Sequence, residues 1–133
     1  MVVENKNKIE LLFNVVEKQM GVNQKEIKGL RKNKEVVTAR NIVGCILNTE
    51  LGLSFKESAR AIERDRTTIL YYIKVLDNNI NYFKFFRENY NAISDKFWSK
   101  MSRADAEDIE LQIQNLHIEI DKLTEIKNKL YLN

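Results

Sequence analysis

No proline interrupts this chain, and glycine occurs only four times. Proline removes a backbone donor and clashes with the preceding helical turn, and glycine lowers helix stability, so their scarcity leaves long stretches able to be helical. Apolar residues recur at helical spacing through most of the chain. The sequence therefore predicts a nearly all-α protein.

Capping residues divide the first half of the chain into helical segments. The first covers residues 6–20 and ends at Gly21, because glycine favours the left-handed conformation that closes many helices. Asn23 followed by Glu26 has the spacing of a capping box, so a short helix is expected over residues 24–30.

A basic linker, residues 31–34, lacks apolar periodicity and is expected to be exposed. Residues 35–51 carry a wide apolar stripe, which predicts a buried helix at the centre of the domain. Gly52 can end that helix. Ser54, with Glu57 three residues later, predicts a second capping box at the start of the next one.

Residues 54–73 contain the pattern with the clearest functional meaning. They predict a short amphipathic helix, a tight turn and a second helix that opens with charged and hydroxyl side chains. A helix-turn-helix lays its second helix in the major groove of DNA, where the first residues of that helix face base edges. The inward faces are expected to hold Phe55, Ser58, Ala59, Ile62, Ile69, Ile73 and Leu76. The pattern predicts binding to double-stranded DNA.

The start of the second helix carries groups suited to base and phosphate contacts. The hydroxyls of Thr67 and Thr68, with unpaired backbone N–H groups, can bind a phosphate. Asp65 can cap the helix or accept from a cytosine amino group, and Arg64 or Arg66 can make a bidentate contact with guanine. The alternative interpretation is a solvated helix start with weak local ion pairs.

Residues 9–80 resemble the C-terminal, origin-box-binding domain of DnaA, the bacterial chromosomal replication initiator. That family opens its recognition helix with Arg-Asp-His-Thr-Thr-Val, and residues 64–69 here read Arg-Asp-Arg-Thr-Thr-Ile. The family's basic loop and its Pro-Arg-Gln-Ile-Ala correspond to residues 31–34 and to Ala-Arg-Asn-Ile-Val at 39–43. Its Leu-Ser-Leu corresponds to Leu-Ser-Phe at 53–55.

The resemblance implies a DNA-binding role for particular residues. A basic side chain of the loop, Lys32 or Arg31, would enter the minor groove, with Lys34 close to the DNA backbone and Arg40 at a phosphate or groove edge. The signature residues would contact major-groove bases and phosphate. The expected DNA-binding residues are Arg31, Lys32, Lys34, Arg40, Lys56, Arg64, Asp65, Arg66, Thr67 and Thr68.

Three departures from the family pattern bear on function. Arg66 replaces the family's histidine, and its five donors can change the base preference at that position. The turn has Ile62-Glu63 in place of a glycine pair, with one residue fewer. No Gly-rich phosphate loop with Lys-Ser or Lys-Thr occurs, so this chain is not expected to be a complete initiator.

An aromatic-rich segment over residues 82–98 follows the motif, in a helix expected to reach residue 100 or to break near residues 89–91. Its aromatic side chains exceed what one helix face can bury, so some are expected to pack between subunits or domains. Two domains are predicted: a DnaA-like helix-turn-helix domain at 1–80 and a helical extension with an oligomerising tail at 81–133.

The last thirty residues show a heptad repeat. Apolar residues alternate at spacings of four and three, with Lys127 in the remaining core position; the others are Ile109, Ile113, Leu116, Ile120, Leu123 and Leu130. Isoleucine at a and leucine at d favour a parallel two-stranded coiled coil, which predicts a homodimer. Three apolar residues outside the seam leave open an antiparallel hairpin against residues 80–100 or a larger bundle: Leu111, Ile118 and Ile126.

Charge is divided along the chain. Residues 25–72 carry ten Lys or Arg against six Asp or Glu, whereas residues 104–133 carry three against seven. The first region can follow phosphates, and the second would be repelled by them.

Catalytic and cofactor chemistry finds no support in the sequence. The single cysteine, Cys45, lies among apolar residues and is expected to be buried and inert, and the single histidine, His117, has no partner cluster. We expect no enzyme activity, no metal or cofactor and no small-molecule substrate. Without a signal peptide or an apolar span, a cytoplasmic, nucleoid-associated protein that does not contact membranes is expected.

The leading hypothesis is a small homo-oligomeric protein that binds DNA sequence-selectively, in replication initiation or regulation or in transcription control, as a phage or mobile-element product. One alternative is an adaptor protein that keeps the helix-turn-helix as a scaffold. Another is a small DNA-packaging, terminase-like subunit.

Overall fold

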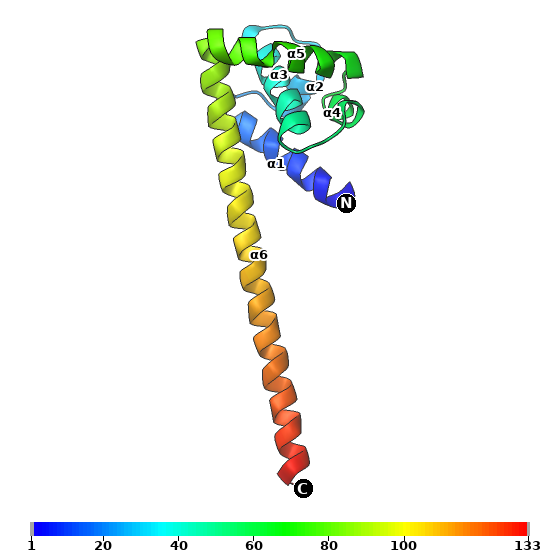
Figure 1. Ribbon diagram of the computed structural model, residues 1–133, viewed down its shortest axis with the longest axis vertical. Helices are drawn as coiled ribbons and strands as arrows, with labels where there is room; N and C mark the ends of the chain where they lie inside the picture. The colour runs from blue at the N-terminus through cyan, green and yellow to red at the C-terminus, as the bar shows by residue number, and fades with distance from the viewer. Residues whose placement is uncertain (1, 133) are drawn as a thin grey trace. The chain divides into compact units, whose positions relative to one another are not determined.

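The computed structural model describes residues 2–132, which form six α-helices and no strand (Figure 1). The helices are α1 Val2–Met20, α2 Gln24–Lys28, α3 Lys34–Thr49, α4 Phe55–Ala61, α5 Arg66–Tyr82 and α6 Lys84–Leu132. The all-α prediction is confirmed.

Both predicted capping boxes are formed. The Asn23 side chain accepts from the Glu26 backbone N–H at 2.9 Å, and the Glu26 carboxylate accepts from the Asn23 N–H at 3.2 Å. Ser54 and Glu57 make the same pair of bonds at the start of α4, at 3.1 and 3.4 Å. Two glycines lie at φ +71 directly after α1 and shortly after α3, as expected of helix-ending residues: Gly21 and Gly52.

Helix α3 is the centre of the core, and α1, α2, α4 and α5 all contact it (Figure 1). Its apolar stripe is fully buried, which confirms the predicted central helix. At Gly44 the recognition helix α5 comes so close that an added Cβ would lie 2.9 Å from the Tyr72 ring and 3.0 Å from Ile69. A larger residue at this crossing would displace α5.

The aromatic segment at the start of α6 packs on the same compact unit. Phe86, Ile93 and Phe97 are buried there, and the Tyr90 hydroxyl donates to the Glu50 carboxylate at 2.8 Å. Burial and this hydrogen bond raise the pKa of Tyr90. The first compact unit therefore runs through Phe97 rather than ending at residue 80, because these aromatic side chains complete its core.

Helix α6 differs in two ways from the expectation. It is unbroken near residues 89–91, and the break lies instead at Phe83, whose extended backbone (φ −119, ψ 104) separates α5 from α6. Because α6 continues without a turn to Leu132, the tail forms no hairpin against residues 80–100.

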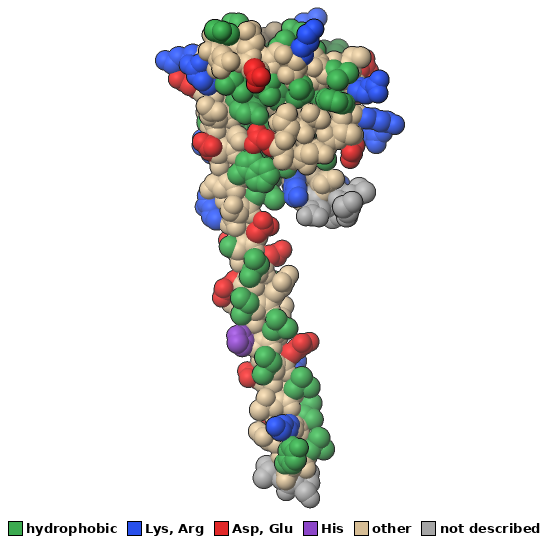
Figure 2. Space-filling model, viewed as in Figure 1, with side chains coloured by type: hydrophobic (Ala, Val, Ile, Leu, Met, Phe, Trp, Pro, Cys, Tyr) green, Lys and Arg blue, Asp and Glu red, His purple; other side chains and the backbone are tan. Residues whose placement is uncertain are grey.

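The second compact unit begins at Trp98 and contains the tail, in which every described side chain from Ser102 to Tyr131 is exposed. Ten of these side chains are large and apolar, and Figure 2 shows hydrophobic groups at intervals along this part of α6.

Candidate nucleic-acid interface

The turn between α4 and α5 is a Schellman motif built on Glu63. Its φ of +53 is left-handed, the conformation that glycine adopts without steric cost. The Arg64 N–H donates to the Ala59 carbonyl at 2.9 Å, and the Glu63 N–H donates to the Arg60 carbonyl at 3.1 Å. The turn therefore closes without the glycine pair of the related family, and a glutamate takes the strained position.

Helix α5 begins with its polar groups facing solvent. Asp65 occupies the N-cap position, but its exposed carboxylate makes no capping hydrogen bond. Arg66 and Thr67 are exposed and Thr68 is half-buried, while Ile69 on the opposite face is fully buried. The exposed face continues along the helix through two large side chains, Leu70 at 43% and Tyr71 at 60% exposure.

The Arg64 side chain turns away from this face. Its guanidinium donates to the Lys28 carbonyl at 3.2 Å and to the Gly29 carbonyl, and it also reaches the carbonyls of Ile62 and Glu63 at 3.4 and 3.0 Å. One side chain therefore holds the end of α2 beside the turn of the helix-turn-helix. The expected guanine contact would require breaking these bonds.

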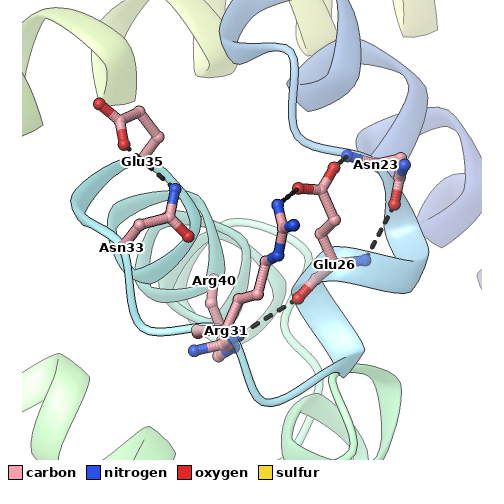
Figure 3. Close-up of polar contacts among 6 residues, drawn as sticks. All are labelled: Asn23, Glu26, Arg31, Asn33, Glu35 and Arg40. Atoms are coloured by element: carbon pink, nitrogen blue, oxygen red, sulfur yellow. Dashed lines mark hydrogen bonds and ion pairs between the residues drawn. The ribbon is translucent and has the colours of Figure 1, made fainter.

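Arg40 also donates hydrogen bonds to backbone carbonyls, at the end of α2 and in the linker between α2 and α3. We expected it at a phosphate or groove edge, but it is only 5% exposed. Its Nε donates to the Ile27 carbonyl at 2.7 Å, and its Nη2 reaches the carbonyls of Gly29 and Arg31 at 3.1 Å. Its Nη2 also reaches the Glu26 carbonyl at 3.2 Å (Figure 3). Burial, followed by the nearby charge of Arg64, lowers the pKa of Arg40.

Two arginines thus bind the carbonyls of residues 26–29 and 31, a use that sequence reasoning missed. Backbone carbonyls that lie between helices and away from water need donors. The signal was the short helix and the linker after it: the last carbonyls of a helix have no partner within that helix, and a linker without apolar periodicity has no helix or strand to pair its own. Which side chains would supply the donors was not readable from the sequence.

The loop that Arg40 and Arg64 hold presents three of the expected contact residues. The Arg31 side chain is 72% exposed and pairs with the Glu26 carboxylate at 3.4 Å (Figure 3), and Lys32 is exposed. The Lys34 ammonium lies 4.5 Å from the centre of the Phe85 ring. Lys56, the remaining expected residue, is exposed on α4.

The other singled-out residues lie away from this surface. Cys45 is fully buried, as expected, its thiol donates to the Asn41 side chain at 3.3 Å, and burial raises the pKa of the thiol to about 12. His117 is exposed in the tail. Among the described residues, no group of three or more His, Cys, Asp or Glu is placed to hold a metal ion. In residues 2–132 no helix is both long and apolar enough to cross a membrane.

Comparison with known proteins agrees with this geometry. A family model described as the bacterial dnaA protein helix-turn-helix matches residues 9–75. The chromosomal replication initiator protein DnaA of Kosmotoga olearia is 28% identical over 71 residues, which are 53% of this chain and 16% of that protein. The match therefore covers a small part of this relative's length.

Proposed function

Because the chain belongs to the bacterial DnaA helix-turn-helix family, we propose that it binds double-stranded DNA sequence-selectively through the start of α5. The observation that carries the proposal is the exposure of Asp65, Arg66 and Thr67 at that helix start, while the carboxylate of Asp65 makes no capping bond. These three side chains offer an acceptor, a bidentate donor and a hydroxyl to one stretch of groove.

Each group has a defined part in the proposed complex. Arg66 donates to the O6 and N7 of a guanine, and Asp65 accepts from a cytosine amino group. The hydroxyls of Thr67 and Thr68 and the free N–H groups of the first turn bind a phosphate. Lys56 neutralises a further phosphate from α4.

The basic loop supplies a second contact. We assign the minor groove to Lys32 or Arg31 and the adjacent backbone to Lys34, since all three are exposed. Arg40 and Arg64 act as positioning residues, because their donors hold the loop carbonyls. Fixing the loop beside the turn lets both contacts form without a further loss of conformational entropy on binding.

The tail is proposed to join two copies of the chain. Monomeric proteins rarely expose apolar surface on the scale of this segment, and its heptad repeat offers a seam that a second helix can cover. A homodimer doubles the DNA contacts. Replication initiation or its regulation is the proposed process, with transcription control as the other use of the same binding, and the nucleoid is the proposed location.

Selection from a random duplex pool with the full chain tests the proposal. We expect one enriched sequence, and Arg66→Ala should lower affinity for it by about tenfold or more, because a bidentate arginine–guanine pair contributes about 1–3 kcal/mol. Lys18→Ala removes an equal charge from α1, outside the motif, and should leave the preference unchanged. Absence of any enriched sequence, or equal effects of the two variants, would refute selective recognition.

A further inference from the structure

The tail, residues 105–131 of α6, carries its charges unevenly. Residues 105–110 have four acidic side chains and no Lys or Arg, whereas residues 122–131 have three lysines and one glutamate. All of them are exposed, and Figure 2 shows acidic groups preceding basic ones along the visible face. A second copy of this helix therefore meets different charges depending on its direction.

The seam that a second copy would cover follows the heptad positions. The a positions of this repeat hold Ile113, Ile120 and Lys127. The d positions hold Ile109, Leu116, Leu123 and Leu130. The apolar members of the seam are 44–73% exposed in the single chain. Burying them needs one further helix along the whole tail.

A parallel, in-register pair brings like charges together at three contacts: one between the two Lys127 side chains and two, related by symmetry, between Asp105 and Glu110. Lys127 at an a position meets Lys127 of the second copy in the core. Asp105 at g then lies across from Glu110 at e of the second copy, which juxtaposes two carboxylates. No g–e′ pair of the tail joins opposite charges in this arrangement, so electrostatics oppose the parallel direction that the Ile and Leu pattern favours.

We infer that the tail pairs with a second copy in the antiparallel direction, with residue 118 at the midpoint. The inference rests on the proposed homodimer. In this register each a residue faces a d residue: Ile113 faces Leu123 of the second copy, and Ile120 faces Leu116. The seam is then continuous from Ala106, which faces Leu130, to the opposite end.

The antiparallel register also gives Lys127 a favourable environment. It faces Ile109 of the second copy, between Asp108 and Glu110 in that helix. A lysine stem can cover the apolar seam while its ammonium reaches a neighbouring carboxylate. The same contact occurs twice in the dimer by symmetry. It replaces the Lys127 pair and the two Asp105–Glu110 pairs of the parallel form, and the antiparallel form brings together one like-charged pair, Glu119 at g with Glu119 of the second copy.

The direction of pairing decides where the two chains enter the coil. In the antiparallel form the two chains enter the coil from opposite ends, with their Ser99 residues about 60 Å apart at a rise of 1.5 Å per residue.

Cysteine crosslinking of the full chain, without DNA, tests the direction. The native thiol is removed by Cys45→Ala, and Ile113→Cys or Leu123→Cys is added. Oxidation of a mixture of the two variants should give a covalent dimer with one copy of each, and each variant alone should stay uncrosslinked. A parallel pair gives the reverse, since a then meets a and d meets d. That reverse result, or no crosslink in the mixture, would overturn the inference.

A matched control separates a dimer from a larger bundle. Ile118→Cys, in the same Cys45→Ala background, lies at the midpoint but on the outer face at an f position. It should not crosslink, and sedimentation should give a dimer. Crosslinking through residue 118, or a tetramer, would overturn the antiparallel dimer. Because no DNA is present, failure here leaves the proposed DNA binding untouched, and failure of DNA selection leaves this result untouched.

Discussion

Replacing Arg64 with methionine distinguishes a positioning arginine from one that contacts a base. Methionine keeps an apolar stem of similar length and removes all five donors. The Lys28 and Gly29 carbonyls then lose the donors that tie the loop to the turn. A hydrogen bond to a charged group contributes about 1.5–3 kcal/mol net. Since Arg64 is only half-buried and water can replace part of the loss, we expect a total destabilisation of about 2 kcal/mol.

The effect on DNA binding should appear in the salt dependence. A loop released from the turn loses phosphate contacts, and each lost contact reduces the slope of log K against log salt by about 0.9. The base preference read by Arg66 should stay unchanged, because the turn at Glu63 and the buried side chain of Ile69 hold the start of α5 in place. If Arg64 instead contacted guanine, the variant would relax one base position by about 1–3 kcal/mol and leave the slope nearly unchanged.

Urea unfolding followed by circular dichroism measures the stability, and titration between about 50 and 200 mM salt with the selected duplex measures the slope. Arg60→Met is the matched control, because it removes an exposed arginine of α4. It should be near neutral in stability. A relaxed base position with unchanged stability and slope in Arg64→Met would refute the positioning role.

Three further predictions concern the motif and the core. Glu63→Gly should raise the unfolding free energy by about 0.5–1 kcal/mol in thermal melts, because relief of the left-handed conformation (about 1–2 kcal/mol) exceeds the entropy cost of glycine. Glu63→Ala should show no such gain. Ser58→Ala should stabilise by about 1 kcal/mol in the same assay, since the Ser58 hydroxyl is buried without a hydrogen-bond partner; destabilisation would show that the hydroxyl is bonded. Burial raises the Cys45 pKa from 9.0 to about 12, so the folded state opposes ionisation and the unfolding free energy should fall as pH rises above about 9. A thiol reagent at pH 8 should label the unfolded chain and spare the native one. Rapid labelling of the native chain would contradict the burial.

Much of the fold could be predicted because its signals are local. A capping box needs only residues three apart, so Asn23 with Glu26 and Ser54 with Glu57 identified two helix starts. A helical stripe likewise depends only on the period of apolar residues, which identified α3 as the central helix. The polar start of α5 was visible for the same reason: an exposed helix end is described by the residues of its own first turn.

What only the tertiary structure decided involves partners far apart in the chain. Arg40 and Arg64 are both cations that could meet phosphate, yet the folded chain brings the carbonyls of residues 26–29 and 31 to them, and a buried carbonyl accepts the nearest donor. Tyr90 joins the first unit because Glu50, forty residues earlier, accepts its hydroxyl. The periodicity of residues predicts which face of a helix is apolar or charged. Which other segment covers that face depends on how helices far apart in the chain pack together.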